Sequence, residues 1–256
     1  MKYLIVGDYH DVPVKGNLDR IIEKEKPDVL VSLGDFDIIE SVNEFLEIKE
    51  QCKKLGINVI DVSGNHDHAI FNEIEISSSI LDSLNTDVSR LHRELEQNPP
   101  AKKYFEYLLK PENIIKRLSI GKFNASVMHG AYMGDYHSSS YVPSGSIIDN
   151  LWFRLRNMPN FQDNFEFMKK RNENLMIRGH DHAPLHGSLS KGNVSYHFPH
   201  DMTIDLNPEE LHVVGPGAFC ENCYAVLIST LDQLLKVRYQ RFEAKLRSLK
   251  DFEGKY

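Results

Sequence analysis

The sequence has few cysteines and no long apolar run. Its 256 residues contain 3 cysteines, an odd number that excludes a fully paired disulfide framework within one chain and favours a reducing compartment. The apolar run at residues 3–6 stops at Gly7 and is too short for the core of a signal peptide. No later run approaches the length of a membrane span. We therefore expect a cytoplasmic protein with no membrane partner.

The sequence also lacks an excess of positive charge. Its formal net charge is -7, and because binding to long nucleic acids relies on clustered Lys and Arg, this balance disfavours such a partner. The hydrophobic fraction of 41% and the charged fraction of 26% are those of an ordinary globular protein. We expect a single domain over residues 1–256, with room for insertions. A homo-oligomer remains open.

The cysteines provide one local pattern. Cys220 and Cys223 form a single Cys-x-x-Cys pair, which could supply half of a zinc site or a redox couple. The sequence has no second cysteine pair to complete a four-sulfur site. We therefore interpret both residues as structural neighbours of a strand.

The first quarter of the chain alternates between strand and helix patterns. Residues 3–6, 29–33 and 57–62 read as short buried strands, and helical periodicity fills the two gaps between them. Ser41 is a plausible N-cap of the second helix and Gly56 a plausible C-cap. This β-α-β-α-β series predicts a parallel sheet.

The remainder of the chain is less regular. Two segments, 71–116 and 131–172, interrupt the rhythm, and we expect them to be helical cap insertions. A hairpin pattern covers residues 117–128. Further strands are predicted at 175–177, 186–190, 194–198, 211–214, 224–228 and 235–239. We expect the strands after residue 182 to form a second sheet packed on the first, which makes the fold class α/β with two sheets.

Five short polar motifs stand directly after predicted strands. In open α/β sheets ligands bind beyond the carboxyl ends of the strands, so these loops are expected to converge on one crevice. A glycine beside four of the motifs would let the backbone turn sharply. Each motif alone is a weak signal, whereas the ordered series is specific. The motifs are Asp8-x-His10, Gly34-Asp35, Gly64-Asn65-His66-Asp67, His129-Gly130 and Gly179-His180-x-His182.

The residue types in these motifs are those of a catalytic metal site. Imidazole binds zinc, iron, manganese and nickel, while carboxylate and amide oxygens suit harder ions. Seven such side chains exceed what one cation can use. Two cations about 3.5 to 4 Å apart that share a carboxylate would use them all, and such pairs serve in-line displacement at phosphorus.

The motif series resembles that of the calcineurin-like metallophosphoesterase family, and the later Gly215-Pro216-Gly217 is similar to a family turn. The resemblance implies a two-sheet β-sandwich flanked by helices, and two divalent transition-metal ions, drawn from Mn, Fe, Zn or Ni. It assigns one ion to Asp8, His10, Asp35 and His182 and the other to Asp35, Asn65, His129 and His180, with Asp35 bridging.

The resemblance also implies an acid beside the metals. His66 would protonate the leaving oxygen of the substrate, and Asp67 would orient the His66 ring. Asp37 could orient a ligating histidine, but a solvated or helix-capping carboxylate is an equal interpretation. His68 is a candidate substrate contact.

Two arginines are further candidates for substrate binding. Arg154 and Arg156 could clamp a phosphate in a bidentate manner, although a pair on a helix surface is the simpler interpretation. They lie with Trp152, the single tryptophan, in the second insertion. We therefore expect the insertions to select the substrate.

The expected activity is hydrolysis of a phosphoester by a hydroxide that bridges two cations. A small phosphodiester or nucleotide substrate is favoured, because the chain reads Gly34-Asp35-Phe36-Asp37 and lacks the Asp-Arg-Gly that follows in protein serine/threonine phosphatases. The alternatives are a phosphomonoesterase, including a protein phosphatase, and a non-catalytic scaffold of the same fold. Retention of His66 together with all seven ligands favours the enzyme.

Overall fold

The computed structural model describes residues 1–74, 87–132, 147–155, 157–230, 232 and 234–243. Its strands are β1 (Lys2–Val6), β2 (Val29–Ser32), β3 (Asn58–Asp61), β4 (Ile115–Ile120), β5 (Phe123–Met128), β6 (Leu175–Arg178), β7 (Pro184–Ser190), β8 (Asn193–His197), β9 (Thr203–Leu206), β10 (Leu211–Pro216), β11 (Cys223–Ser229) and β12 (Leu235–Arg241). Its helices are α1 (Leu18–Glu25), α2 (Ile39–Leu55), α3 (Asn65–Asn72), α4 (Val88–Glu96), α5 (Pro99–Leu108), α6 (Pro111–Ile114), α7 (Asp149–Trp152), α8 (Met158–Lys170) and the 3-10 turn η1 (Phe219–Glu221).

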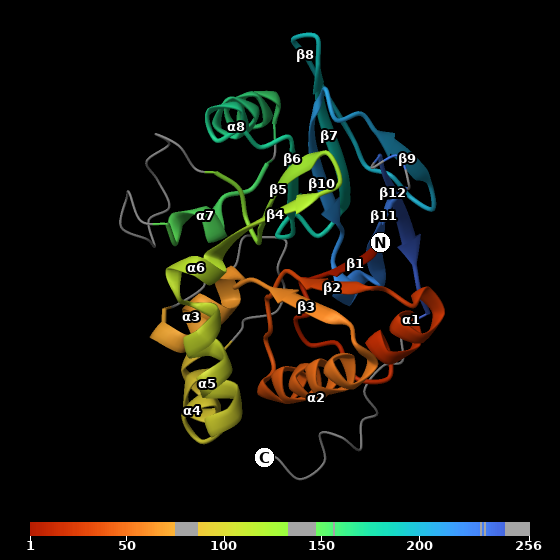
Figure 1. The fold of residues 1–256 in the computed structure, drawn as a ribbon. Coiled ribbons are helices and arrows are strands. Elements are labelled where there is room, and N and C mark those ends of the chain that lie inside the picture. Colours follow the sequence, from red (N-terminus) through yellow and green to blue (C-terminus); the bar gives the residue numbers. More distant parts are fainter. Residues whose placement is uncertain (75–86, 133–146, 156, 231, 233, 244–256) are drawn as a thin grey trace.

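Two mixed sheets of six strands form the centre of the molecule (Figure 1). One has the order β3-β2-β1-β11-β12-β9 and the other the order β4-β5-β6-β10-β7-β8. Helices flank the pair of sheets, so the predicted two-sheet α/β fold is confirmed. Within the described residues, no helix combines the length and the apolarity that crossing a bilayer requires.

The predicted parallel start is present, because β1, β2 and β3 pair in parallel. Gly56 ends α2 with a φ of 71°, as expected of a C-cap. The predicted N-cap was wrong: α2 begins at Ile39 with Ile38 as its N-cap. Ser41 lies inside the first turn, and its hydroxyl donates to the carbonyl oxygen of Val12 at 3.1 Å. The Ser41 side chain therefore contacts a loop distant in sequence and does not cap its own helix.

The late strands divide between the two sheets, which corrects the expectation that they build the second sheet alone. β11 pairs antiparallel with β1, and β12 and β9 extend that sheet. The second sheet instead combines β4, β5 and β6 with β10, β7 and β8. Strand periodicity shows which residues face a core, but it does not show which edge a strand joins. The short strand β9 was not predicted, and only Leu206 of its four residues is fully buried.

The hydrophobic core has a layer on each face of β1. Tyr3 and Ile5 pack between the two sheets, while Leu4 and Val6 face the helices of the first sheet. Burial of both faces explains why β1 reads as a continuous apolar run. A third cluster lies between the second sheet and α8.

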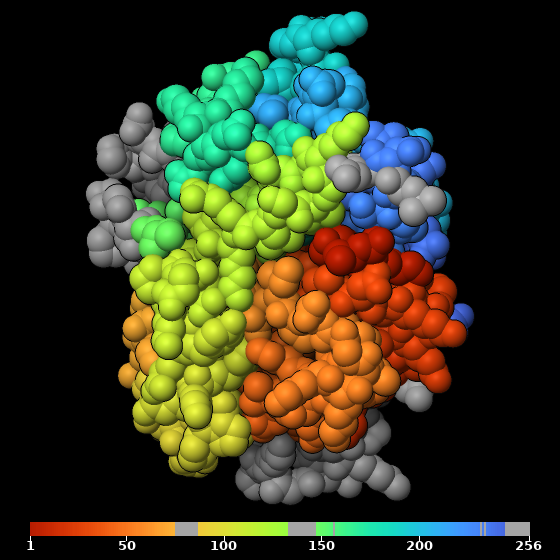
Figure 2. All heavy atoms as spheres, in the orientation of Figure 1, coloured from red at the N-terminus to blue at the C-terminus, as the bar shows by residue number. Residues whose placement is uncertain are grey.

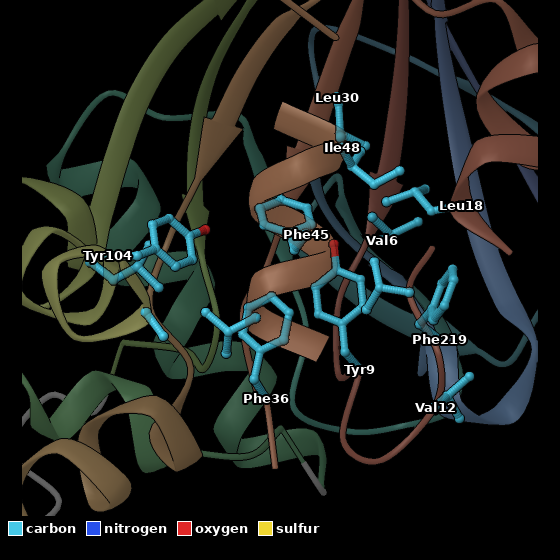
Figure 3. Packing of buried hydrophobic residues seen from close by; sticks show 14 of the residues in the cluster. Val6, Tyr9, Val12, Leu18, Leu30, Phe36, Phe45, Ile48, Tyr104 and Phe219 are labelled. Carbon is cyan, nitrogen blue, oxygen red and sulfur yellow. The ribbon is translucent and has the colours of Figure 1, made fainter. Parts of the chain in front are cut away.

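Helices from the first predicted insertion belong to this core. α4 and α5 contribute Leu91, Leu95 and Phe105 to the cluster that includes residues of β1. Figure 3 shows Tyr104 of α5 in the same cluster as Phe45 of α2. In Figure 2 these helices, in yellow, sit directly against the orange N-terminal part. The cap boundaries 71–116 and 131–172 stay a prediction.

Two histidines are buried side by side in the second sheet. His186 of β7 stacks on His212 of β10 with ring centroids 5.5 Å apart, and its Nε2 lies 3.3 Å from Nδ1 of that neighbour. Burial, together with the nearby His212 and His197, lowers the pKa of His186 to about 3. The folded state therefore binds fewer protons than the unfolded state between pH 3 and the ordinary value for histidine.

We predict that the free energy of unfolding falls as the pH drops below about 6.5, the ordinary histidine pKa. At about pH 5.5, one such histidine lowers the free energy of unfolding by about 1 kcal/mol. His186→Gln should therefore lose less stability than wild type between about pH 7.5 and pH 5.5, measured by urea unfolding at each pH. His200→Gln, at an exposed position, is the control. An identical pH dependence in both variants would contradict the prediction.

Candidate metal centre

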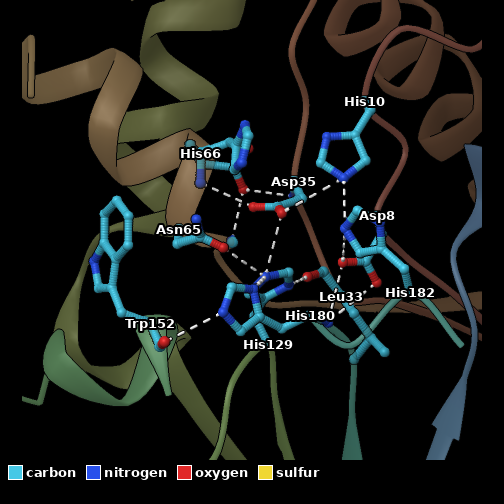
Figure 4. Close-up of polar contacts among 12 residues, drawn as sticks. Asp8, His10, Leu33, Asp35, Asn65, His66, His129, Trp152, His180 and His182 are labelled. Atoms are coloured by element: carbon cyan, nitrogen blue, oxygen red, sulfur yellow. Dashed lines mark hydrogen bonds and ion pairs between the residues drawn. The ribbon is translucent and has the colours of Figure 1, made fainter. Parts of the chain in front are cut away.

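All seven candidate ligands meet at the carboxyl ends of five strands (Figure 4). Six of them are buried and His182 is partly exposed. Their side chains point toward one another from loops that are far apart in the sequence. The ligands follow β1 (Asp8, His10), β2 (Asp35), β3 (Asn65), β5 (His129) and β6 (His180, His182).

One group of ligands surrounds the Nε2 atom of His129. This atom lies 2.9 Å from Oδ1 of Asn65, 3.1 Å from Nδ1 of His180 and 3.3 Å from Oδ2 of Asp35. The Nδ1 atom of His129 lies 2.8 Å from the carbonyl oxygen of Leu33, which fixes the ring. We call Asp35, Asn65, His129 and His180 site 2.

A second group adjoins the first through the same carboxylate. Nε2 of His10 lies 3.1 Å from Nε2 of His182 and 4.0 Å from Oδ2 of Asp35. Nε2 of His182 lies 3.8 Å from Oδ1 of Asp8. We call Asp8, His10, Asp35 and His182 site 1. Asp35 therefore faces both sites.

The side chains of both sites are arranged in a way that suits cations, because several of their polar atoms lack a suitable partner within the cluster. The Oδ2 atom of Asp35 is buried and accepts no hydrogen bond of good geometry from the described residues, although it sits between the His10 and His129 nitrogens. Pairs of imidazole nitrogens also face each other at 3.1 Å in both sites. Buried polar atoms without partners are costly. A divalent cation in each site would satisfy these atoms.

Strained backbone accompanies the ligands. Positive φ is uncommon outside glycine and costs about 1–3 kcal/mol per residue. Hydrogen bonds between loops hold the chain in this conformation: the amide of Asp8 donates to Gly34 at 2.9 Å, and that of His10 to Asp35 at 2.8 Å. The ligands with positive φ are Asp8 (54°), His10 (47°), Asp35 (73°), His180 (71°) and His182 (59°).

Aromatic residues between the ligands anchor two of the loops. Tyr9 and Phe36 are fully buried and stack with ring centroids 4.6 Å apart and planes 10° from parallel. Figure 3 shows this pair beside Phe45 and Phe219. Because alternate residues of each loop point to opposite sides, burial of these rings directs the ligands into the site.

Glycines serve two purposes here. Gly34 has a φ of 74°, as expected for a sharp turn. Gly64 has ordinary backbone angles, but a Cβ atom there would lie 2.1 Å from Oδ1 of Asp35. The prediction that these glycines let the backbone turn sharply therefore holds for Gly34, whereas Gly64 allows two ligand loops to approach closely.

The predicted acid His66 has a different partner from the one expected. Asp67 accepts from the amides of Gly64 at 2.7 Å and Phe36 at 3.0 Å, so it braces the loops. The His66 Nδ1 atom instead contacts Oδ1 of Asp37. Nδ1 of His10 lies 2.8 Å from the other oxygen of the same carboxylate. Asp37, not Asp67, thus orients the ring, and it also supports a candidate ligand.

The electrostatics follow from burial and these contacts. Burial disfavours protonation of His66, but the carboxylates of Asp35 and Asp37 outweigh it and raise the His66 pKa. Burial, together with the nearby Asp35 carboxylate, raises the pKa of Asp67 to about 6. Burial lowers the pKa of His180 well below its ordinary value. In the metal-free protein His180 is therefore neutral, as a ligand must be.

A buried ion pair behind the last motif was not predicted. Arg178 is fully buried, pairs with Asp181, and donates to the carbonyl oxygens of Gly130 at 2.8 Å and Phe153 at 3.3 Å. It thereby joins the loops that carry His129 and His180. The only signal in the sequence was an arginine directly after the apolar strand pattern of residues 175–177.

The candidate substrate contacts lie beside site 2. The Nε atom of Arg154 lies 3.2 Å from Nε2 of His180, and that nitrogen lies 3.2 Å from the carbonyl oxygen of Trp152. The ring of His68 meets Trp152 edge to face at 6.3 Å. Nδ1 of His68 and Nε1 of Trp152 are buried and find no hydrogen-bond partner among the described residues. Arg156 lies outside those residues.

The fold and the clustered ligands define the class of protein. Two six-stranded sheets carry candidate metal-binding clusters where the loops at their strand ends converge. The sequence matches the calcineurin-like phosphoesterase superfamily domain over residues 1–227, and the chain belongs to that superfamily. A search of curated proteins finds no match.

Solved structures share the fold. A metallophosphoesterase from Sphaerobacter thermophilus has a TM-score of 0.61 and 21% sequence identity, covering 96% of this chain and 90% of that chain. A hypothetical protein from Pyrococcus horikoshii OT3 has a TM-score of 0.62 and 14% identity, over 95% and 88%. A Saccharomyces cerevisiae protein serine/threonine phosphatase has a TM-score of 0.53 and 13% identity, over 97% and 82%. At these identities the likeness concerns the fold alone.

We predict that protein purified without chelator contains about two transition-metal equivalents per chain, as two adjoining sites require. Asp35→Ala should reduce the content of both sites, because its carboxylate faces both. Plasma emission spectrometry measures the metal, and circular dichroism checks the fold. Asp205→Ala, which removes an exposed carboxylate of β9, is the control. Two tightly bound equivalents in Asp35→Ala would show that this carboxylate is not shared.

Proposed function

We propose that this chain is a dinuclear metal-dependent hydrolase of small phosphoesters. The observation that supports it most directly is the position of Asp35. Its buried Oδ2 lies between the nitrogens of His10 and His129 and accepts no hydrogen bond from the part of the chain that the structure describes. Two ligand groups thus share one carboxylate. A structural metal would need four ligands in one closed shell, whereas this arrangement is typical of two-metal catalysis.

Sites 1 and 2 would hold the two divalent cations. When bound, they would lower the pKa of water to near neutrality and offset charge on the phosphoryl group. The protein supplies the remaining function, proton transfer. Nδ1 of His66 is held by Asp37, so its Nε2 remains to donate a proton to the leaving oxygen. The Asp37 carboxylate, which contributes to the raised pKa of His66, favours the protonated ring that such an acid needs.

Arg154 is the proposed phosphate contact of this site. When Nδ1 of His180 serves as a ligand, its Nε2 carries the proton and donates to the carbonyl oxygen of Trp152, 3.2 Å away. Nε2 then no longer accepts from Arg154. The guanidinium can then bind phosphate oxygens. The nitrogens of His68 and Trp152, which have no partner among the described residues, lie nearby for the organic part of the substrate.

The test of the function is hydrolysis of bis(p-nitrophenyl) phosphate and p-nitrophenyl phosphate by protein loaded with Mn²⁺. We expect turnover that a chelator abolishes and added metal restores, with the diester preferred. A preference for the monoester would favour the phosphomonoesterase alternative. Metal-loaded protein that hydrolyses neither ester, nor a panel of nucleotides, would favour the non-catalytic scaffold and reject the proposal.

His66→Ala should lower turnover about 10²- to 10⁴-fold on substrates with poor leaving groups, the usual contribution of a general acid. Esters whose leaving group is a stable anion should suffer less, because they need little protonation. Turnover against leaving-group pKa measures this, with metal content determined in the same samples. If metal is lost, or the leaving-group dependence is unchanged, His66 is not the acid.

Asp37→Asn should reproduce part of the His66→Ala effect, because it weakens the hold on the His66 ring. It should also weaken metal binding at site 1 by about 10- to 100-fold, since it supports His10, so turnover is measured at saturating metal. His66→Gln is the matched variant, which removes the acid but leaves Asp37. A normal leaving-group dependence in Asp37→Asn would remove Asp37 from this role.

Arg154→Ala should raise KM by roughly 10- to 100-fold, because this factor corresponds to the binding free energy of a hydrogen bond from a charged group. Metal content should stay normal, because site 2 keeps its ligands. Trp152→Phe should alter the relative rates among substrates with different organic groups. The control is Arg171→Ala, because Arg171 forms an ion pair with Glu173 in another part of the surface. Unchanged KM values would place substrate binding elsewhere.

A further inference from the structure

A cysteine lies beside site 1. Sγ of Cys220 and the ring nitrogens of His10 and His182 all lie within 4.8 Å of one another. Cys220 belongs to η1 and is partly buried. These two histidines are also ligands of site 1, so the sulfur adjoins a cluster that already fits a cation.

The backbone holds this cysteine in place. The amide of Cys220 donates to the carbonyl oxygen of Asp8 at 3.2 Å, and the amide of Ala218 donates to that of His182 at 2.7 Å. Gly217, with a φ of 80°, forms the turn that brings η1 to these loops. The segment is thus tied by hydrogen bonds to two of the loops that carry site 1 ligands.

Two further observations point to a cation at this place. The Nε2 atoms of His10 and His182 face each other at 3.1 Å. The buried Oδ2 atom of Asp35, 4.0 Å from Nε2 of His10, accepts no hydrogen bond from the described residues. The sulfur therefore adjoins two ring nitrogens, one of which is 4.0 Å from a buried carboxylate oxygen that a cation would satisfy.

We propose that Cys220 is an additional, soft ligand of the ion in site 1 and makes that site prefer thiophilic cations such as Zn²⁺, Co²⁺ or Cd²⁺. The thiol would release its proton to solvent as the bond from sulfur to the metal forms. The inference rests on the proposed metal centre, and it replaces the structural interpretation of Cys220. Cys223 keeps that interpretation, because it is buried in β11.

The two sites would then differ in chemical character. Site 2 carries the amide oxygen of Asn65, and the candidate cluster there, Asp35 with His129 and His180, has no sulfur. Thiolate selects soft ions, whereas carboxylate and amide oxygens suit Mn²⁺ and Mg²⁺. A protein offered both kinds of ion should therefore place the softer one in site 1.

Cobalt spectroscopy tests this without relying on activity. Co²⁺ added to the metal-free wild-type protein should give a near-ultraviolet charge-transfer band from thiolate to cobalt, along with the visible bands of bound cobalt. Cys220→Ser should lose the charge-transfer band and keep visible bands. Cys223→Ser, the other member of the pair, is the matched control and should keep both. His180→Ala should also keep the charge-transfer band, because it alters site 2.

Metal affinity provides a second measurement. Cys220→Ser should raise the Kd of the tighter Cd²⁺ site by about tenfold or more. Removing a group that only supports a metal ligand already weakens binding by about 10-fold at the least. The Kd for Mn²⁺ should change much less, since serine oxygen suits the harder ion. Equal changes for both ions would overturn the proposal, as would an unchanged Cd²⁺ affinity.

The same samples are assayed for hydrolysis of bis(p-nitrophenyl) phosphate. Hydrolysis by cobalt protein without a charge-transfer band would overturn the role of Cys220 and leave the proposed function intact. A band that depends on Cys220, in protein that hydrolyses no ester, would support the role of Cys220 and reject the proposed function. A band that persists in Cys220→Ser would assign the sulfur to another cysteine and also reject the proposal.

Discussion

The candidate metal centre depends on the pairing of two loops, residues 7–10 and 34–37. Backbone hydrogen bonds join them at Asp8 and His10, and the stacked rings of Tyr9 and Phe36 lie on the core side. Each loop alternates between a residue that enters the core and a residue that enters the site. Burial of the aromatic rings therefore fixes the direction of the carboxylates and the imidazole.

This arrangement concentrates strain and like charge in one place. Asp8 and Asp35 have positive φ angles and are buried, and Asp37 lies within hydrogen-bond distance of His10. Such a site is costly without cations, since buried carboxylates need partners. Bound metal would add stability in proportion to RT ln(1 + [L]/Kd). Folding and metal loading are thus expected to be linked.

The sequence predicted that the candidate ligands would meet, because each motif follows a strand that its own periodicity reveals. Residues such as Asn65 and His129 stand where buried strands end, and a parallel sheet brings such ends together. The sequence did not reveal the partner of His66. Asp67 was the nearer carboxylate along the chain, but its oxygens are used by backbone amides. Asp37, from another loop, holds the ring.

The same distinction applies to the sheets. The apolar runs of β1 and β11 predicted two strands, yet their antiparallel pairing depends on contacts across more than two hundred residues. By itself, the sequence determined most of the strands, the order of the motifs and the residue types of the candidate metal centre, because these depend on local periodicity and residue type. Tertiary structure alone decided which strands share a sheet, which carboxylate orients His66 and that Cys220 approaches His10 and His182. Those outcomes depend on long-range packing, which leaves no periodic signal in the chain.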